Sequence, residues 1–258
     1  MSEGTVRYER EGVIARVTFE RPDARNAMTW AMYEALGAAC ERIRSDRDVR
    51  VAVFRGAGGK AFVAGTDIAQ FGSFASGDDG VAYERRIDAC LSQLESLPVP
   101  TLAVVEGWAI GGGLAIAACC DLRIATPGAR FGVPIARTLG NCLSIESIAR
   151  LVAVLGVPLL KRMLLLADNL AAETLLPPGF VAEIVPPDAL DARVSALAAQ
   201  LAGHAPITMR VTKEAVRRLA AAGIPGGEDL VHETYGSADF REGVAAFVAK
   251  RPPRWQGR

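Results

Sequence analysis

This sequence lacks an excess of either positive or negative charge. It has 29 lysines and arginines against 29 aspartates and glutamates, so its formal net charge is zero. Nucleic acids and anionic membranes attract proteins through clustered positive charge. We therefore expect neither nucleic acid nor a membrane as a partner, although a local basic cluster could still bind a phosphate group.

Residues that bind metals are also scarce. The two histidines, His204 and His232, match no catalytic triad or metal motif, and the five cysteines show no CxxC pair or similar ligand spacing. We expect no metal site. An odd number of cysteines, with an N-terminus that lacks the apolar region of a signal peptide, is typical of reduced thiols, so we expect a cytoplasmic protein.

Long hydrophobic runs are missing as well. The longest runs, near residues 102–105 and 152–155, fall far short of the roughly 20 apolar residues that a membrane span needs. Half of the 258 residues are apolar and 22% are charged, which is ordinary for a chain that buries a sizeable core. The length suits one large α/β domain, or such a domain with a small appendage.

The N-terminal part of the sequence alternates between strand and helix patterns. Apolar residues at every second position between 13 and 19 predict a strand. Thr29 can cap a helix whose apolar residues recur at helical spacing, namely Met32, Leu36, Cys40 and Ile43. Further strands are predicted at 49–53, 101–105 and 122–125, with a helix over 79–97. This alternation indicates sheets that are covered on both faces.

From about Ser144 onward the pattern becomes mostly helical. Helices are predicted at 144–155, 158–167, 189–202, 207–222 and 238–250, with one short strand candidate at 181–185. No internal repeat or low-complexity linker separates the two parts. The sequence therefore predicts a β-α core that is followed by a helical tail.

Two segments rich in glycine lie between a predicted strand and a predicted helix. Residues 59–68 read GKAFVAGTDI, and residues 106–125 read EGWAIGGGLAIAACCDLRIA. The first N–H groups of a helix have no partner within it and can face a developing negative charge. A thioester carbonyl that becomes an enolate or a tetrahedral oxyanion needs two such donors. Either segment alone is more typical of a packing turn.

Taken together and in this order, the two segments resemble the signature of the crotonase (enoyl-CoA hydratase/isomerase) family. That signature reads F-x-A-G-A-D-L/I, followed by G-x-A-x-G-G-G-x-E-L-A-x-x-C-D-x-R-I-A. Residues 21–28, RPDARNAM, resemble the family segment RP-x-x-x-NAL, which lies along the coenzyme. Residues 237–247, SADFREGVAAF, resemble the family ending S-x-DF-x-EG-x-x-AF. With four ordered motifs, the chain is identified as a member of this family.

The resemblance implies an α/β (α+β) fold of the crotonase/ClpP-like type. Repeated β-β-α units would form two roughly perpendicular sheets surrounded by helices. Residues 1–195 would be the crotonase core, and residues 196–258 would be a helical C-terminal trimerisation region. The expected partners are an acyl-CoA substrate and further copies of the chain, in a homotrimer or a dimer of trimers.

The same resemblance implies where the site lies. The backbone N–H groups of Thr66 and Gly112 would form the oxyanion hole, and Asp67 is best interpreted as a helix cap. Residues near the coenzyme would be Arg25, Ala27, Ala64 and Gly65, while Lys250, with Arg251 and Arg254, could neutralise phosphates. No separate cofactor is expected, because CoA enters as part of the substrate.

This sequence departs from the family at two positions that matter for chemistry. Hydratases of the family use one glutamate in the GGG-x-E segment and one in FG-x-PE, and these positions hold Ala115 and Ile135 here. Adding water to a conjugated double bond requires one group that takes a proton and another that protonates the α-carbon. Neither alanine nor isoleucine can do so, and we expect no efficient hydratase.

Other groups are candidates to replace the lost glutamates. Arg137 could hold a substrate carboxylate or a second carbonyl, and a surface or interface ion pair is an equal alternative. Weaker candidates are Tyr83, Glu84, Asp88, Asn141 and Cys142, whereas Glu106 is interpreted as structural. Three functions stay open: an enzyme with altered acid/base groups, such as an isomerase, hydrolase, decarboxylase or lyase; a weak hydratase; or a non-catalytic acyl-CoA-binding or assembly subunit.

Overall fold

Two sheets form the centre of the fold. The computed structural model describes residues 3–223 and 228–255. The six-stranded sheet has the order β1-β2-β3-β5-β7-β10, and the four-stranded sheet has the order β4-β6-β8-β9. The strands are β1 (Thr5–Glu11), β2 (Ile14–Glu20), β3 (Val51–Gly56), β4 (Ala61–Val63), β5 (Thr101–Val105), β6 (Trp108–Ile110), β7 (Leu122–Ala125), β8 (Arg130–Gly132), β9 (Asn169–Ala171) and β10 (Glu183–Ile184).

Helices surround these sheets. The α-helices are α1 (Trp30–Ser45), α2 (Gly77–Glu95), α3 (Gly112–Cys119), α4 (Ile135–Thr138), α5 (Ile145–Leu165), α6 (Ala172–Leu175), α7 (Leu190–Ala202), α8 (Pro206–Ala221), α9 (Glu228–Gly236) and α10 (Ala238–Val248). Two 3-10 helices are η1 (Pro22–Ala24) and η2 (Ile68–Ser73). None of the described helices is both long and apolar enough to cross a membrane.

The predicted β-β-α repeat is present three times. The units are β3-β4-α2, β5-β6-α3 and β7-β8 followed by α4 and α5. In each unit the first strand belongs to the six-stranded sheet and the second strand belongs to the four-stranded sheet. Neighbouring units pair in parallel, so that β3, β5 and β7 lie side by side, as do β4, β6 and β8.

Parallel pairing of the short strands determines where the glycine segments lie. Ala61 pairs with Trp108 and Val63 pairs with Ala109, so that β4 and β6 end at the same edge of the sheet. The chain that leaves β4 and the chain that leaves β6 therefore emerge next to each other. These two exits are the segments that precede η2 and α3.

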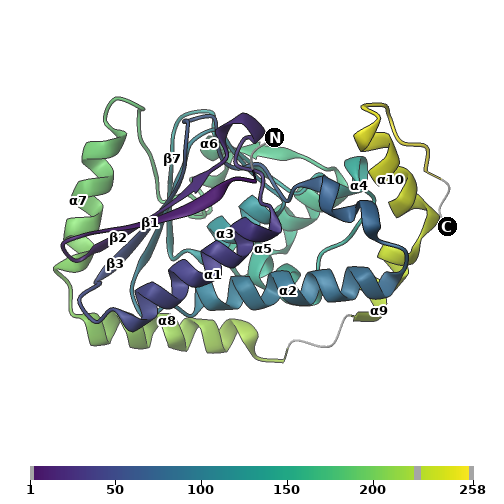
Figure 1. Cartoon of the computed structure of the whole chain (residues 1–258). Helices are drawn as coiled ribbons and strands as arrows, with labels where there is room; N and C mark the ends of the chain where they lie inside the picture. The colour runs from purple at the N-terminus through teal and green to yellow at the C-terminus, as the bar shows by residue number, and fades with distance from the viewer. Residues whose placement is uncertain (1–2, 224–227, 256–258) are drawn as a thin grey trace.

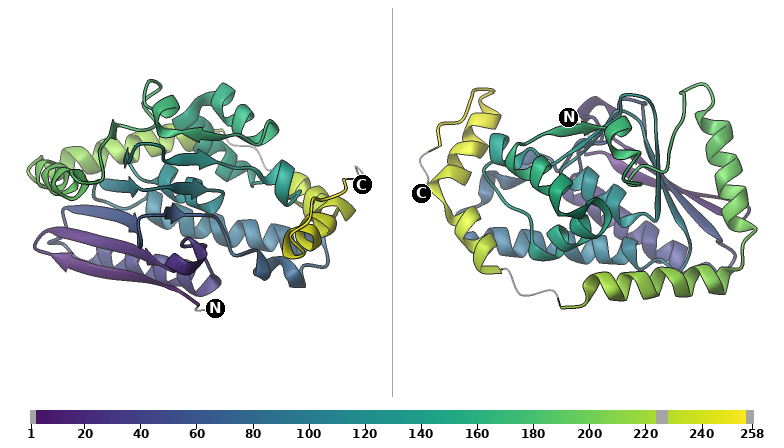
Figure 2. Two further views of the ribbon diagram at one scale, coloured as in Figure 1. Left: turned by 90° about the horizontal axis from the view of Figure 1, so that it is seen from above. Right: turned by 180° about the vertical axis from the view of Figure 1, so that it is seen from behind.

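Different helices lie at the two ends of the molecule. α7 packs on one face of the six-stranded sheet, where Val53, Leu102 and Val194 belong to a small apolar core. α9 and α10 lie at the opposite end, where they contact α2 and η2 (Figure 1). α8 runs along one side, from the α7 end towards the C-terminal helices (Figure 2).

Several predicted elements are confirmed. β5 and β7 have the predicted bounds, and the Thr29 hydroxyl caps α1 by accepting a hydrogen bond from the Met32 N–H at 3.2 Å. The two helices predicted at 144–155 and 158–167 form the single element α5, which is kinked at Gly156 with φ 72°. The predicted domain boundary at residue 195 lies within α7 and stays a prediction.

Candidate functional site

The first proposed oxyanion donor is held beside the segment that follows η1. Met28 forms a parallel bridge with Thr66, in which the Met28 N–H donates to the Gly65 carbonyl and the Asp67 N–H donates to the Met28 carbonyl, each at 2.8 Å. These bonds use the groups on either side of Thr66. The Thr66 N–H therefore points away from Met28.

The second proposed donor begins a helix. Gly112 is the first residue of α3, so its N–H has no acceptor within the helix. Gly111, with φ 54°, turns the chain into α3, and its own N–H donates to the Gly132 carbonyl at 2.9 Å. A Cβ placed on Gly112 would lie 3.9 Å from the Thr66 nitrogen. The structure therefore places the two residues side by side.

A chain of hydroxyl groups lies against these two residues. The Tyr33 hydroxyl is 2.8 Å from the Thr66 Oγ1, which is 3.0 Å from the Tyr83 hydroxyl. The Tyr33 hydroxyl would also lie 2.6 Å from a Cβ on Gly112. Tyr83 was a weak candidate from the sequence, whereas Tyr33 was missed. No local spacing relates residues 33, 66 and 83, which only the fold brings together.

The protonation state of this chain follows from its burial. Burial raises the pKa of both Tyr33 and Tyr83 above the usual value for a phenol, and the hydrogen bonds with Thr66 oppose this only in part. Both phenols are therefore neutral near pH 7. They can donate a hydrogen bond or a proton, but neither is a base under these conditions.

The positions of the expected hydratase glutamates hold apolar side chains. Ala115 is buried one turn after the start of α3, and its N–H donates to the Gly111 carbonyl at 3.1 Å. Ile135 begins α4 and packs against the main apolar core. Arg137 is on the same short helix but is exposed, and nothing in the described structure brings its side chain to Thr66 or Gly112. Its predicted role stays untested.

A buried polar network holds the proposed coenzyme segment in place. The Asn26 carboxamide accepts from the Arg21 N–H at 2.9 Å and donates to the carbonyls of Ala57 and Ala61 at 2.9 and 2.8 Å. The Arg21 guanidinium donates to the Ala27 carbonyl at 3.1 Å. This network fastens the loop after η1 to the start of β4.

Four of the predicted coenzyme residues lie together, and one lies elsewhere. The Ala64 N–H donates to the Arg25 carbonyl at 3.1 Å, Ala27 lies two residues after Arg25, and Gly65 directly follows Ala64. Lys250 follows α10 and is exposed, and the described contacts do not link it to this group. Among the other predicted phosphate ligands, Arg251 is already paired with Glu242 at 2.6 Å, and the Arg254 N–H donates to the same carboxylate.

Asp67 caps the helix that follows, as predicted. Its Oδ1 accepts from the Ala69 N–H at 3.1 Å, at the start of η2. Its Oδ2 forms an ion pair with Arg21 at 2.7 Å. Asp67 therefore connects the oxyanion segment to the coenzyme segment and has a structural role.

A second group of buried polar side chains surrounds Glu84, which lies on α2 and directly follows Tyr83 in the sequence. Glu84 is 4% exposed, and its two oxygens accept from the Tyr235 hydroxyl at 2.7 Å and the Ser144 N–H at 2.9 Å. The Tyr235 hydroxyl also accepts from the Asn141 amide at 3.1 Å. Burial raises the pKa of Glu84 to about 7, although both hydrogen bonds act in the opposite direction.

The remaining candidates have structural partners. Asp88 accepts from Arg150 at 2.7 Å and from Ser147 at 3.0 Å. Burial raises the pKa of the Cys142 thiol to about 11, which makes it a poor nucleophile near pH 7. Glu106 accepts from Arg55 at 2.7 Å, which supports its interpretation as structural. Within the described residues, no cluster of three or more His, Cys, Asp and Glu side chains has the arrangement of a metal site.

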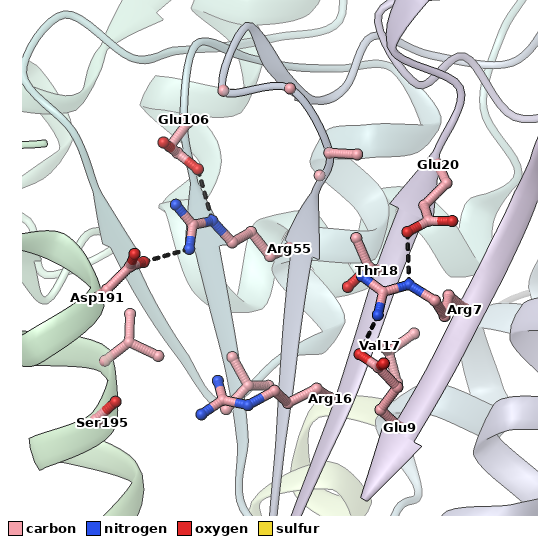
Figure 3. Close-up of a pocket in the computed structure, with 16 residues that line it drawn as sticks. Arg7, Glu9, Arg16, Val17, Thr18, Glu20, Arg55, Glu106, Asp191 and Ser195 are labelled. Atoms are coloured by element: carbon pink, nitrogen blue, oxygen red, sulfur yellow. Dashed lines mark hydrogen bonds and ion pairs between the residues drawn. The ribbon is translucent and has the colours of Figure 1, made fainter. Parts of the chain in front are cut away.

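A cavity of about 470 Å³ lies between β1–β3 and α7, away from Thr66 and Gly112 (Figure 3). Arginines give this cavity a basic appearance, but they are paired with carboxylates. The pairs are Arg7 with Glu9 and Glu20, Arg16 with Glu11, and Arg55 with Glu106 and Asp191. Because these charges are already compensated, we do not assign the coenzyme phosphates to this cavity.

Known proteins resemble this chain along its whole length. The family profile described as enoyl-CoA hydratase/isomerase matches residues 9–258. The short-chain-enoyl-CoA hydratase of Clostridium acetobutylicum is 31% identical over 255 residues, which cover 97% of each chain. The (E)-benzylidenesuccinyl-CoA hydratase of Thauera aromatica is 31% identical over 256 residues, covering 98% of this chain and 99% of that protein.

Solved structures show the same architecture. An enoyl-CoA hydratase/carnithine racemase from Magnetospirillum magneticum is 34% identical with a TM-score of 0.81, covering 100% of this chain and 97% of that one. A methylmalonyl-CoA decarboxylase, solved with 2S-carboxypropyl-CoA, is 25% identical with a TM-score of 0.89, and the match covers 100% of both chains. Related folds therefore carry out more than one kind of reaction.

Proposed function

Because the chain belongs to the enoyl-CoA hydratase/isomerase family, we propose that it is an enzyme that binds an acyl-CoA thioester and polarises its carbonyl between the N–H groups of Thr66 and Gly112. The adjacent positions of these two residues, at the ends of the parallel strands β4 and β6, carry the proposal. Two preorganised amides next to the thioester oxygen would stabilise the negative charge that develops there.

The proposed reaction is not efficient hydration. Ala115 and Ile135 stand where the family resemblance places the two hydratase glutamates, and neither side chain can transfer a proton. The hydroxyl groups of Tyr33 and Thr66 lie near Gly112, the Tyr83 hydroxyl contacts Thr66, and the two phenols are neutral near pH 7. The site therefore suits a thioester reaction that needs an oxyanion hole and a proton donor but no strong base.

Coenzyme binding is proposed along the joined segments that contain Arg25, Ala27, Ala64 and Gly65. These segments are fixed by the buried Asn26 and by Arg21, so the path is formed before a ligand binds. Lys250 and Arg137 stay hypotheses, since both are exposed and each would have to reach the substrate from outside this group.

We also infer a homotrimer or a dimer of trimers. α8 has no buried residues, and its exposed apolar side chains are Ile207, Val211, Val216 and Leu219. Beside it lies a groove of about 450 Å³ with Val154, Met209 and Val216 in its lining. An exposed apolar surface of this kind is typical of a subunit interface, which supports the assembly that the family resemblance implies.

Calorimetry with acetyl-CoA and with acetate tests the proposed ligand. We expect acetyl-CoA to bind and acetate to bind far more weakly, because coenzyme contacts would supply most of the affinity. Free CoA is the control that separates coenzyme contacts from thioester contacts. Equal affinities for acetyl-CoA and acetate would contradict the proposal, and binding without turnover of any acyl-CoA would indicate a non-catalytic subunit.

A further inference from the structure

Glu84 is a buried carboxyl group whose hydrogen-bond donors carry no charge. It is 4% exposed, and it accepts from the Tyr235 hydroxyl at 2.7 Å and the Ser144 N–H at 2.9 Å. Among the described residues, no lysine, arginine or histidine forms an ion pair with it. A carboxylate that leaves water without a cation is costly, whereas a neutral carboxyl group is much less so. The packing around Glu84 therefore favours its protonated form.

The two arginines beside this carboxyl group already have carboxylate partners. Both belong to the lining of a cavity of about 200 Å³ that Glu84 also lines. Arg150, from α5, pairs with Asp88 at 2.7 Å and with Glu95 at 3.2 Å. Arg85, from α2, pairs with Glu228 of α9 at 2.7 Å. Neither arginine is therefore left to compensate a charge on Glu84.

The other titratable groups around Glu84 come from each element that packs there. Asp88 and Glu146 oppose the ionisation of Glu84, because a second carboxylate carries the same charge. The remaining groups are Tyr83 of α2, Cys142 of the loop before α5, and Tyr235 and His232 of α9, with Asp78 of α2 lying 3.5 Å from His232.

α9 lies close against α2 because two glycines of α2 face it. A Cβ on Gly77 would overlap the carbonyl oxygen of His232, and a Cβ on Gly80 would overlap the Tyr235 ring. Glu84 follows Gly80 by four residues, so it lies on the same face of α2. Full hydration of its carboxyl group therefore requires α9 to move away from α2.

α9 and α10, here called the C-terminal cover, pack against aromatic side chains next to the proposed oxyanion hole (Figure 1). The Tyr235 ring has centroid separations of 6.5 Å from Phe71 and 6.1 Å from Tyr83. The Phe240 ring lies 6.0 Å from Phe71. The Tyr83 hydroxyl in turn lies 3.0 Å from the Thr66 Oγ1. Separation of the C-terminal cover from α2 would therefore expose the aromatic side chains next to Thr66.

We propose that Glu84 is a pH switch for the C-terminal cover: the cover is closed while this carboxyl group is protonated, and it separates from α2 when the group ionises. The switch itself requires only the contact between α2 and α9. Its consequence for ligands rests on the proposed function, because it requires an acyl-CoA site beside Thr66.

The direction and the pH range of the switch follow from the two environments of Glu84. In the closed cover, burial raises its pKa to about 7, although the hydrogen bonds from Tyr235 and Ser144 act in the opposite direction. In the open form the carboxyl group meets water, and its pKa returns to the ordinary value of about 4.5. Between these two values the ratio of open to closed form rises about tenfold for each pH unit, and above pH 7 it becomes constant.

Hydrogen exchange of the ligand-free protein between pH 5 and pH 8, corrected for intrinsic exchange rates, tests the switch. We expect the protection factors of α9 and α10 to fall on the order of 10²-fold, mostly below pH 7. Both helices should exchange faster than β5 and β7, because the opening is local. Glu84→Gln cannot ionise and should keep its protection constant. His232→Gln, the matched control, removes the exposed ion pair with Asp78 at the same helix contact and should keep the wild-type pH dependence.

The variant Tyr235→Phe provides a second test that does not depend on the folding of Glu84→Gln. It keeps the aromatic ring and removes a hydroxyl group that favours the ionised form of Glu84. The pH at which the protection factors become constant should therefore move upward. An unchanged pH profile in Tyr235→Phe would contradict the role of this hydrogen bond in the switch.

The outcomes separate the switch from the proposed function. Protection factors of α9 and α10 that do not depend on pH, or that keep their pH dependence in Glu84→Gln, would overturn the switch. Exchange of these helices only together with β5 and β7 would overturn it as well. The association rate of acetyl-CoA, measured by stopped flow, should rise more steeply from pH 5 to pH 7 in the wild type than in Glu84→Gln, and equal slopes would overturn the link between cover and site. Failure to bind acetyl-CoA at any pH would instead overturn the proposed function and leave the exchange result standing.

Discussion

Gly112 and Gly113 are adjacent in α3 but differ in what surrounds them. A Cβ on Gly112 would lie 2.6 Å from the hydroxyl oxygen at the end of the Tyr33 side chain, and not against backbone. A Cβ on Gly113 would overlap the carbonyl oxygen of Val63, which belongs to the backbone of β4. The first glycine therefore leaves room for the Tyr33 hydroxyl beside the proposed oxyanion hole, and the second is required by the packing of α3 on the sheet.

The variants Gly112→Ala and Gly113→Ala should separate these two requirements. We expect Gly112→Ala to fold, with a melting temperature within a few degrees of the wild type, and to lose thioester turnover because Tyr33 is displaced beside the oxyanion hole. Gly113→Ala should be destabilised by several kcal/mol or fail to fold, because backbone must shift. Thermal melts and acyl-CoA turnover check both variants. A stable Gly113→Ala variant would contradict the close contact with β4.

The raised pKa of Glu84 predicts how the stability of the protein depends on pH, and the direction of the pKa shift gives the sign of that dependence. The folded pKa of about 7 is above the usual value, so the folded state holds a proton between about pH 4.5 and 7 that the unfolded state has lost. The free energy of unfolding then falls as the pH rises through this window. The groups that act on Glu84 are the Tyr235 hydroxyl, the Ser144 N–H, and the carboxylates Asp88 and Glu146.

The variant Glu84→Gln measures this effect. Relative to the wild type, Glu84→Gln should gain on the order of 3 kcal/mol of stability between pH 4.5 and pH 8, because it cannot ionise. Denaturant unfolding of both proteins across that range gives the difference. Parallel stability curves for the two proteins would show that the pKa of Glu84 is not raised in the folded state.

How far individual site residues could be predicted depended on whether their role is local. The helix cap at Asp67 could be predicted because capping is local, whereas Thr66 and Gly112 were indicated by the family resemblance and stay a prediction as oxyanion donors, although the structure places them side by side. The contact of Tyr33 with Thr66 and Gly112 could not be predicted, because it joins α1 to the ends of β4 and β6. Such contacts depend on packing between elements and leave no local pattern.

At the scale of elements, helices and strands were predicted correctly where they contain enough residues for their hydrophobic period to be recognised. The buried strands β5 and β7 were predicted with their observed bounds. β4, β6 and β8 have three residues each, too few for a period of two to be recognised. α9 was also missed, although Val231 and Tyr235, four residues apart, are both buried.

The exposed apolar side chains of α8 lead to a prediction about how the protein assembles. Light scattering of the wild type should give three or six times the 27.3 kDa mass of one chain. Val211→Glu combined with Leu219→Glu places two charges on the exposed apolar side of α8 and should shift the protein towards a monomer. Arg210→Glu, on the same helix, is the control that changes charge at an exposed polar position. A stable wild-type monomer at micromolar concentration would contradict the assembly.

At the scale of the whole molecule, the site is a consequence of topology. β4 and β6 belong to successive β-β-α units, with α2 and β5 between them in the chain, yet their parallel pairing places Thr66 and Gly112 side by side. Neighbouring parallel strands end at the same edge of a sheet, where their exits can form a ligand site. The order of the motifs predicted the fold, while the closing contacts of α9 and α10 with α2 and η2 came only from the structure.

Restoring the two carboxylates tests whether the fold still supports hydration. Ala115→Glu combined with Ile135→Glu should raise crotonyl-CoA hydration measurably, because the pair would again supply an acid and a base. Ala115 is buried, so a carboxylate there should have a raised pKa and lower the stability by several kcal/mol. Each single substitution is the control, and neither should match the double variant. Equal activity of a single variant and the pair would contradict the two positions as a catalytic pair.

The most direct measurement is the rate at which the unmodified protein hydrates crotonyl-CoA. An oxyanion hole without the two glutamates should give a turnover at least roughly 10³-fold below that of a family hydratase, since each lost acid or base typically forfeits about 10²–10⁴ in rate. The short-chain-enoyl-CoA hydratase of Clostridium acetobutylicum, assayed in parallel, gives the reference rate. A wild-type rate equal to that reference would show that other residues supply the protons, and it would contradict the central claim.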